Sequence, residues 1–321
     1  MSIARMLGIT YPIIQGAMAQ IAFAELAAAV SNAGGLGVIA SGGMSADRLR
    51  EEINKCKSLT TKPFGVNLML MAPNRDELAQ LVIDEGVKVV TTGAGSPKNY
   101  VAMWKAAGIV VIPVVPSVQI ARKMEALGVD AIVAEGTEAG GHVGETTTMV
   151  LIPQAADAVS IPVIAAGGIA DGRGAAAAFA LGAQGVQVGT RFLATIECPA
   201  HEQFKQAVVA ARDGDTVVTG RSLGVPVRSI KNRMTLEYMR LENGGASKEE
   251  LEALAMGSLG LAVRDGDTEN GSIMAGQIAG LVSEITTVQE VITSMFAEAK
   301  TVGRKVYKMT DDVHTGAGAL Y

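Results

Sequence analysis

Eight short, apolar, β-prone runs recur between Tyr11 and Val188, and they constrain the fold of the chain more than any other feature. They cover residues 11–15, 36–40, 64–68, 87–91, 110–114, 131–134, 162–166 and 185–188. Successive runs begin roughly 20–30 residues apart, which is the spacing of one strand, one helix and the loops that connect them. We therefore predict eight strands that alternate with helices.

The segments between these runs show helical periodicity. Leu49, Ile53 and Cys56, for example, stand at positions i, i+4 and i+7 of one segment. Glycine residues mark the expected helix ends just before strands, at Gly86, Gly108, Gly128 and Gly182. Strict alternation favours a parallel sheet covered by helices, and eight repeats favour its closure. The predicted fold is therefore an α/β TIM (β/α)8 barrel, with an open doubly wound sheet as the alternative because spacing alone does not show closure.

The pattern changes after the eighth run. We expect residues 1–195 and 286–310 to form the barrel, residues 196–285 to form a mostly helical lid inserted between strand eight and the final helix, and residues 311–321 to form a flexible tail. The predicted elements of the lid are helices at 201–212, 234–241, 248–255 and 271–282 and a loop at 216–229. Ser247 is a candidate cap for the third of these helices, and residues 288–299 form the strongest amphipathic pattern.

Composition excludes several classes of protein. Hydrophobic residues make up 49% of the 321 residues and aromatic residues only 4%, so Ala, Val, Ile, Leu and Met must build the core. A formal net charge of −5 argues against nucleic-acid binding, which needs a basic surface. No apolar run reaches the roughly 18–20 residues of a membrane span, and the N-terminus lacks a signal-peptide core. Cys56 and Cys198 provide neither a disulfide framework nor a metal-ligand spacing, so we expect a cytoplasmic protein.

The chemistry is expected first in the loop of residues 135–142, which follows the sixth run. Glycine lets a backbone approach a ring or a phosphate closely, and histidine transfers protons near neutral pH. His142 lies among Gly140, Gly141 and Gly144 and has little core to pack against, so we favour a catalytic role over a capping role. Glu135, Glu138 and Glu145 lie nearby and are either tuning groups for His142 or simply solvated charges.

Other strand ends carry unusual residues that a closed barrel would bring to the same rim. The eighth strand ends at Gly189-Thr190, and the seventh ends at Gly167-Gly168. Strands seven and eight of such barrels commonly bind phosphate through backbone N–H groups, although a glycine pair alone is more often only a tight turn. Asn67 lies inside an apolar strand and needs a hydrogen-bond partner, which either a ligand or the protein could supply.

Cys198 and a cluster of basic residues give weaker indications of function. Cys198 is a conceivable nucleophile, but no basic group lies near it in the sequence to lower its pKa, so we expect it to be inert. Between Val217 and Leu241 the chain has five basic residues against one acidic residue, Glu237; the basic ones are Arg221, Arg228, Lys231, Arg233 and Arg240. This excess could meet an anionic cofactor or partner.

Six motifs follow one another along the chain: Pro12-Ile13-Ile14-Gln15-Gly16-Ala17-Met18, Asn32-Ala33-Gly34-Gly35-Leu36-Gly37, Gly65-Val66-Asn67, Glu135-Gly136-Thr137-Glu138-Ala139-Gly140-Gly141-His142, Ala165-Ala166-Gly167-Gly168-Ile169 and Val188-Gly189-Thr190-Arg191-Phe192. In this order they resemble the nitronate monooxygenase superfamily of FMN barrels. Within the superfamily, residues 135–142, Thr146-Thr147-Thr148-Met149, Gly220-Arg221-Ser222 and Met274-Ala275-Gly276-Gln277 look most like FabK-type enoyl-[acyl-carrier-protein] reductases. Nitronate monooxygenases usually carry Gln where this chain has Glu135, which favours the reductase.

The resemblance implies that the barrel mouth binds FMN, with Asn67, Glu135 and Gly140 beside the ring and the two glycine-containing strand ends on the phosphate. The full set of implied cofactor contacts is Gln15, Gly16, Ala17, Met18, Asn67, Glu135, Ala139, Gly140, Gly141, Gly167, Gly168, Gln187, Gly189 and Thr190. It also implies NADH or NADPH as the hydride source, a trans-2-enoyl chain on acyl carrier protein or coenzyme A as the substrate, and a homodimer, and it allows a monovalent-cation requirement.

The implied reaction places a hydride on the β carbon of the enoyl thioester and a proton on its α carbon. The enolate between these steps needs a hydrogen-bond donor and a proton source, and His142 is the candidate for one of these two roles. A nitronate-oxidising flavoenzyme is the close alternative. A barrel isomerase or a phosphate-binding protein without flavin is the alternative from another class.

Overall fold

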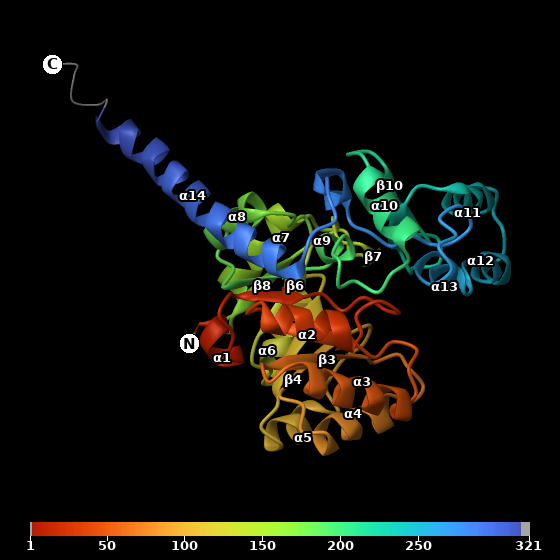
Figure 1. Ribbon diagram of the computed structural model, residues 1–321, viewed down its shortest axis with the longest axis horizontal. Helices are drawn as coiled ribbons and strands as arrows, with labels where there is room; N and C mark the ends of the chain where they lie inside the picture. The colour runs from red at the N-terminus through yellow and green to blue at the C-terminus, as the bar shows by residue number, and fades with distance from the viewer. Residues whose placement is uncertain (1, 316–321) are drawn as a thin grey trace.

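The computed structural model describes residues 2–315 of the chain, and it confirms all eight predicted strands (Figure 1). They run parallel in one sheet with the order β1-β9-β8-β6-β5-β4-β3-β2. Their bounds are β1 Ile13–Gln15, β2 Gly37–Ala40, β3 Phe64–Met69, β4 Val89–Gly93, β5 Val110–Val115, β6 Ile132–Glu135, β8 Val163–Ala166 and β9 Gly185–Val188. Each is a short, nearly continuous apolar run, as expected of strands covered on both faces.

The sheet closes on itself between β1 and β2. The Gln15 N–H donates to the Leu36 carbonyl (2.9 Å), and the Leu36 N–H donates to the Ile13 carbonyl (2.9 Å). The Gln15 side chain reinforces the seam, since its Oε1 accepts a hydrogen bond from the Val38 N–H (3.0 Å). The fold is therefore a closed TIM barrel, and the open-sheet alternative is wrong.

Helices surround the barrel in the predicted alternation. Their bounds are α2 Ala24–Asn32, α3 Ala46–Leu59, α4 Arg75–Asp84, α5 Val101–Ala106, α6 Val118–Ala126, α7 Thr148–Ala158, α8 Gly172–Ala180 and α9 Thr190–Leu193. The predicted helix ends Gly86, Gly108, Gly128 and Gly182 all have the left-handed backbone that a β-carbon disfavours, with φ between 65° and 100°. A local signal thus correctly predicted where these helices end.

Two apolar cores hold the barrel together. The larger core lies between the strands and the helices, and Trp104, Leu26 and Phe192 are among its buried members. The smaller one fills the barrel itself with side chains such as Ile14, Val89 and Ile164. The short helix α1, Ile3–Leu7, contributes Ile3 and Leu7 to this inner core and so plugs the end of the barrel where the strands begin.

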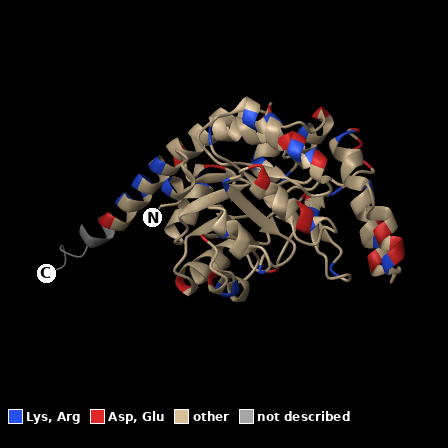
Figure 2. Cartoon of the chain, turned by 90° about the horizontal axis from the view of Figure 1, so that it is seen from below, with Lys and Arg blue, Asp and Glu red and all other residues tan. Residues whose placement is uncertain are grey.

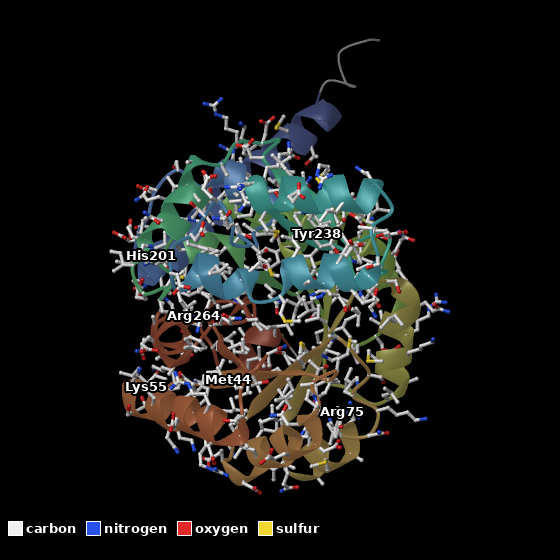
Figure 3. All side chains as sticks on the ribbon, turned by 90° about the vertical axis from the view of Figure 1, so that its right-hand side faces the viewer. Met44, Lys55, Arg75, His201, Tyr238 and Arg264 are labelled. Atoms are coloured by element: carbon white, nitrogen blue, oxygen red, sulfur yellow. The ribbon has the colours of Figure 1, made fainter. Side chains whose placement is uncertain are left out.

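The insertion between β9 and the last helix contains strands as well as helices. It comprises α10 Glu202–Ala210, β10 Thr216–Thr219, β11 Val227–Ile230, α11 Arg233–Asn243, α12 Lys248–Ala255, α13 Ser258–Val263 and the 3-10 helix η1 Gln277–Leu281. The first three predicted helices of the insertion are confirmed. Ser247 caps α12 as expected by accepting from the Glu250 N–H, and Tyr238 lies between α11 and α12 (Figure 3).

Two predictions within the insertion are wrong. Residues 216–229, predicted as a loop, contain β10 and most of β11, which pair antiparallel because runs of Val and Thr favour strands. Residues 271–282, predicted as a helix, are helical only in η1. The preceding backbone is engaged by distant segments instead, for example through a hydrogen bond from the Ile230 N–H to the Ile273 carbonyl (2.9 Å).

The chain ends in a long helix, α14 Val288–Thr315, that leaves the barrel and extends away from the body (Figure 1). Residues 311–315, expected in the flexible tail, therefore continue this helix, while residues 316–321 lie outside the described part of the chain. Within residues 2–315, no helix is both long and apolar enough to cross a bilayer.

Candidate active site

Four polar side chains point into the barrel at the end where its strands terminate. Side chains on a strand alternate between two faces, so a residue two positions after an interior side chain also faces inward. Thr91 follows Val89, and Glu135 follows Val133, both of which belong to the inner apolar core. Asn67 pairs with Thr91. Gln187 follows Gly185, where a β-carbon would lie 3.3 Å from Ile3 Cγ2 of that core.

We call Asn67, Thr91, Glu135 and Gln187 the polar ring. The Nδ2 of the predicted residue Asn67 has a partner in the protein, since it donates to Thr91 Oγ1 (2.9 Å). Its Oδ1 accepts no hydrogen bond from residues 2–315 and is available to a ligand. Thr91 was not among the predicted site residues, although its place opposite a polar residue on the neighbouring strand was the signal that could have found it.

Glu135 has no partner within the protein. Its half-buried carboxylate takes part in no hydrogen bond or ion pair of the described chain, and burial raises the pKa of Glu135 from 4.5 to about 7. Desolvation disfavours the charged form of a carboxyl group. Near neutral pH this side chain can therefore hold a proton and act either as a hydrogen-bond donor or as an acceptor.

The segment after β1 lies beside the end of β9. A β-carbon on Gly16 would meet Gly189 Cα at 3.5 Å and Gln187 Cγ at 3.7 Å, and one on Gly189 would meet only Met18 Sδ, at 3.8 Å. Ala17 packs against the inner core. The predicted residues Gly16, Ala17, Met18, Gln187 and Gly189 thus form one continuous wall.

Gln15 and Gln187 play different parts in this wall. Gln15 is fully buried, its side chain bonds the Gly16 carbonyl and the Val38 N–H, and its own N–H donates to the Leu36 carbonyl, so it holds the barrel together. Gln187 is 8% exposed and makes no side-chain hydrogen bond to residues 2–315. An amide that is nearly buried without a protein partner is expensive, so Gln187 is the better candidate for ligand contact.

Gly167 and Gly168 form a tight left-handed turn at the end of β8, with φ of 88° and 72°. A β-carbon on Gly167 would lie 2.8 Å from the Gly136 carbonyl oxygen, so close packing explains that glycine without any ligand. The N–H groups of Gly168 and Gly189, in contrast, donate to no acceptor in the described chain. Free backbone N–H groups on neighbouring strand ends are the usual elements of an anion site.

The loop of residues 135–142 is fixed at its centre by Glu138. That carboxylate accepts from the Thr148 N–H (3.0 Å) and from Thr148 Oγ1 (2.9 Å) at the start of α7. Thr148 Oγ1 also lies 3.1 Å from the Gly167 carbonyl oxygen. Glu138 therefore has a structural role rather than a role in tuning His142.

A segment of the insertion, residues 274–277, crosses this loop at van der Waals distance. A β-carbon on Gly140 would lie 2.6 Å from the Ala275 carbonyl carbon, which explains why residue 140 is a glycine. The Gly276 N–H donates to Thr190 Oγ1 (2.8 Å), and the Gln277 N–H donates to the Glu138 carbonyl (2.9 Å). Ala139 lies in the same crossing. The predicted residues Ala139, Gly140 and Thr190 therefore hold the insertion across the strand ends.

His142 lies on the short strand β7, Gly141–His142, which adds to the β10–β11 hairpin. Residue 142 pairs with Val227, and Gly141 pairs with Arg228. The His142 side chain is exposed and makes no hydrogen bond to the described residues, while Met274 Sδ lies 3.9 Å from the position of a β-carbon on Gly141. The His142 side chain is thus free to meet a ligand.

The basic stretch lies in two places: Lys231, Arg233 and Arg240 line one cavity on the insertion, and Arg228 points into the fold. Arg228 is 7% exposed, and its Nε donates to the Thr137 carbonyl (3.1 Å) while a terminal nitrogen donates to Thr216 Oγ1 (2.9 Å). Burial, and then the nearby charge of Arg221, lower the pKa of Arg228. Arg240 pairs with Glu237. Arg221, Lys231 and Arg233 are exposed and form no ion pair within residues 2–315. Arg221 lies on the turn between β10 and β11, near Arg228.

Two cavities of the molecule lie away from the polar ring. One of about 1100 Å³ lies on the insertion between α10 and α11, and one of about 180 Å³ lies between Arg191 and α14. Neither is lined by a member of the polar ring. Among the described residues, no three His, Cys, Asp or Glu side chains gather as metal ligands. Cys198 is buried, and burial raises its pKa, so the thiol is inert as expected.

Comparisons with known proteins agree on the family. The nitronate monooxygenase family model matches residues 2–298. FabK from Thermotoga maritima has a structure 47% identical in sequence, with a TM-score of 0.94, covering 96% of this chain and 98% of that one. A nitroalkane oxidase structure from Streptomyces ansochromogenes is 30% identical, with a TM-score of 0.82, covering 94% of this chain and 99% of that one.

Curated relatives carry two kinds of name. A Mycobacterium tuberculosis protein named (3aS,4S,5R,7aS)-5-hydroxy-7a-methyl-1-oxo-octahydro-1H-indene-4-carboxyl-CoA dehydrogenase is 36% identical over 339 residues, covering 92% of this chain and 95% of its own. A probable nitronate monooxygenase of Staphylococcus haemolyticus is 40% identical over 285 residues, covering 74% of this chain and 80% of its own. The chain therefore belongs to the nitronate monooxygenase family of flavin-dependent oxidoreductases.

Proposed function

We propose that the protein is an FMN-dependent enoyl-[acyl-carrier-protein] reductase that uses NADH or NADPH. The observation that carries this proposal is the likeness to FabK, which extends over the barrel and the insertion together at 47% identity. The insertion supplies the segment that crosses Gly140, so the likeness includes the strand ends at which a substrate would meet the cofactor. The relative named as a carboxyl-CoA dehydrogenase supports a thioester as the substrate class.

The residues at the strand ends fit FMN. The free N–H groups of Gly168 and Gly189 suit a phosphate, and the absence of a β-carbon at both positions leaves the backbone accessible. The unpartnered Gln187 amide and the Asn67 Oδ1 suit the donors and acceptors of a polar ring system. The predicted contacts Gly16, Ala17, Met18, Gly167 and Gly141 are proposed to line the cofactor site as well, with Gln15 supporting them from behind.

The chemistry that bound FMN supplies is the transfer of a hydride from NADH or NADPH to the β carbon of a trans-2-enoyl thioester. The protein must supply the proton that reaches the α carbon and a donor for the thioester oxygen. His142 is exposed and unbonded, and it can provide one of these two functions. Glu135, whose pKa is about 7, can hold a proton inside the barrel mouth. The segment 274–277 restricts the access of water to the strand ends.

The carrier of the enoyl chain is proposed to be acidic acyl carrier protein, with coenzyme A as an alternative carrier. The exposed, unpaired Arg221 on the β10–β11 turn is the proposed contact for its acidic groups. Arg228 is not proposed as a contact because its guanidinium already donates hydrogen bonds to the Thr137 carbonyl and to Thr216 Oγ1. If Arg221→Gln left the Michaelis constants for acyl carrier protein and for the nucleotide unchanged, this role would be refuted.

One paired assay tests the proposed function. The purified protein is first examined for the visible absorption of bound flavin, which a barrel isomerase or a flavin-free phosphate-binding protein would lack. Reduction of a crotonyl thioester by NADH or NADPH is then compared with oxygen consumption on a nitronate. Rapid thioester reduction with little nitronate oxidation supports the reductase, and the opposite pattern contradicts it. Repeating the assay with each nucleotide and with Na⁺ or K⁺ replaced by an inert cation tests the remaining cofactor expectations.

Nitronate oxidation is the second candidate function. It is favoured by the family match over residues 2–298 and by the likeness to the nitroalkane oxidase structure. Glu135 distinguishes the two candidates. The resemblance implies that nitronate monooxygenases usually carry a neutral Gln at this position, whereas burial raises the pKa of Glu135 to about 7, so this side chain can gain and lose a proton. The assay above separates the two reactions without any variant.

A further inference from the structure

Charged residues are almost absent from the strands of the protein. Most Lys, Arg, Asp and Glu residues lie on helices and loops (Figure 2). The strands within residues 2–315 hold just two of them, Glu135 at the end of β6 and Arg228 on β11. Glu135 begins the loop of residues 135–142, and β11 pairs with the last two residues of that loop. Arg228 is therefore a rare strand charge that lies beside the candidate active site.

The guanidinium of Arg228 is expensive to bury. The residue is 7% exposed and forms no ion pair within residues 2–315. Burial is the main cause that lowers the pKa of Arg228; the nearby charge of Arg221 lowers it further, and the charge of Glu138 opposes both. A well-packed apolar side chain often stabilises such a position as well as a buried charge does, or better. Packing alone therefore does not account for an arginine here.

Arg228 connects the two halves of the loop. The first half is fixed to the chain that follows it, since the Thr137 N–H donates to the Thr146 carbonyl (2.9 Å). The second half ends in β7, where Gly141 pairs with Arg228 and His142 is the next residue. The Arg228 side chain reaches back to the first half, because its Nε donates to the Thr137 carbonyl (3.1 Å). One residue thus holds the strand of His142 through its backbone and the start of the loop through its side chain.

A second hydrogen bond fixes the orientation of the guanidinium. Its Nη1 donates to Thr216 Oγ1 (2.9 Å) on β10, the strand that pairs with β11. Two nitrogens of one planar group therefore bond two separate acceptors. A lysine ammonium is a point charge on a flexible stem and would not fix both acceptors in the same geometry. The Thr137 carbonyl is thereby held at a defined place relative to the β10–β11 hairpin.

We propose that Arg228 is a positioning residue for His142: by bonding the Thr137 carbonyl from β11, it fixes β7 relative to the end of β6 and so sets the place of the imidazole. Arg228 itself touches neither substrate nor cofactor. The reaction that it serves rests on the proposed function, whereas the link rests on contacts within the described chain. A misplacement of about 1 Å can lower turnover about 10²-fold, so loss of the link should appear in kcat.

Steady-state kinetics of three variants test this role. Arg228→Met removes the N–H donors and keeps an unbranched stem. The kcat of thioester reduction should fall by roughly 10–100-fold, while the Michaelis constants for nucleotide and thioester change by less than about twofold, because no binding group is removed. Arg228→Lys keeps the charge and should lie between Arg228→Met and the wild type. The matched control is Arg240→Met, at an exposed position paired with Glu237, which should behave as the wild type.

Hydrogen exchange measured by mass spectrometry reads the same link without a substrate. Amides of residues 137–143 should exchange about fivefold faster in Arg228→Met, the effect of losing one hydrogen bond, while those of α7 exchange as in the wild type. Thr216→Val removes only the second acceptor. It should change the exchange rate and kcat in the same direction by a smaller factor, and it tests the link even if Arg228→Met does not fold.

Unchanged exchange of residues 137–143 in Arg228→Met would overturn the positioning role, whatever the activity of the protein. Faster exchange with an unchanged kcat would overturn it too, because the loop would then move without consequence for catalysis. An Arg228→Lys variant as active as the wild type would assign the effect to charge and not to geometry. A wild type that reduces no thioester refutes the proposed function instead; the kcat comparison is then made with nitronate oxidation, and the exchange result still decides the link.

Discussion

At the scale of single residues, some polar groups of the site are hydrogen-bonded within the protein and others have no partner in the described chain. Asn67 and Glu138 are hydrogen-bonded to Thr91 and Thr148, so removing either of them would disturb the fold as well as any ligand. Glu135 and Gln187 have no partner in the described chain and are therefore free for a ligand. His142 is exposed and unbonded. These last three residues are the ones at which function can be changed with little structural consequence.

His142→Ala is expected to lower thioester reduction by about 10²–10⁴-fold, the usual contribution of a general acid or of a positioned donor. The stability of the protein should change by less than about 0.5 kcal/mol, because an exposed side chain without partners is removed. Steady-state turnover, the flavin spectrum and the melting temperature are measured together. Unchanged turnover would remove His142 from the mechanism, and loss of bound flavin would assign it to cofactor binding.

Glu135→Gln is expected to stabilise the cofactor-free protein at alkaline pH. Because the pKa of Glu135 is raised from 4.5 to about 7, the folded state holds the proton more tightly than the unfolded state. Stability from this group is therefore present below pH 4.5 and is lost as the pH rises to about 7. After allowance for partial exposure, the variant should gain about 1–2 kcal/mol at pH 8 and nothing at pH 4.5.

Thermal unfolding at several pH values measures this effect. The matched control is Glu145→Gln, at an exposed position of the same loop, for which no such pH dependence is expected. Equal behaviour of the two variants would show that Glu135 is solvated in the free protein.

At the scale of elements, the insertion is held on the barrel by backbone contacts at two crossing points. Gly140 passes beneath Ala275-Gly276, and the Gly276 N–H bonds Thr190 Oγ1. Because β11 also pairs with β7, the hairpin and the crossing segment both attach to the loop that carries His142. The position of the candidate catalytic side chain therefore depends on the docking of the insertion.

Thr190→Val is expected to loosen this docking. The variant removes the acceptor of the Gly276 N–H, which costs about 1 kcal/mol and corresponds to roughly fivefold faster hydrogen exchange at that amide. Thr190→Ser retains the hydroxyl and should exchange like the wild type. Equal exchange in all three proteins would mean that the hydrogen bond does not control the crossing segment.

At the scale of the whole molecule, the site joins residues from both ends of the chain. The strand ends of β1, β3, β6, β8 and β9 converge on it, and the insertion closes over it from residues far along the sequence. A cavity of about 1100 Å³ between α10 and α11 lies apart from this convergence. Ligand binding should therefore stabilise the barrel and the insertion as one unit.

FMN is accordingly expected to raise the melting temperature of the cofactor-free protein in a single transition. At a free FMN concentration 100 times the dissociation constant, binding should add about 2.7 kcal/mol to the free energy of unfolding. Differential scanning calorimetry over a series of FMN concentrations measures the shift, with riboflavin as the matched ligand that lacks the phosphate. Equal stabilisation by both ligands would contradict the assignment of the Gly168 and Gly189 N–H groups to the phosphate.

The sequence by itself determined the number of the barrel strands, their order along the chain and four of the helix ends, and it predicted where the candidate site lies. These features rest on short-range rules: periodicity within one element, glycine at left-handed turns, and the meeting of all parallel strand ends at one rim. Even the inward direction of Asn67, Glu135 and Gln187 follows from counting in steps of two along each strand.

Only the tertiary structure decided which polar groups are satisfied and which are free. Nothing local to Gly140, Glu138 or Arg228 reveals that their partners are Ala275, Thr148 and Thr137. The same reason accounts for the two errors in the insertion. Residues 271–276 and 216–229 take their backbone conformation from pairing with distant segments, and pairing energies between remote segments override local propensity.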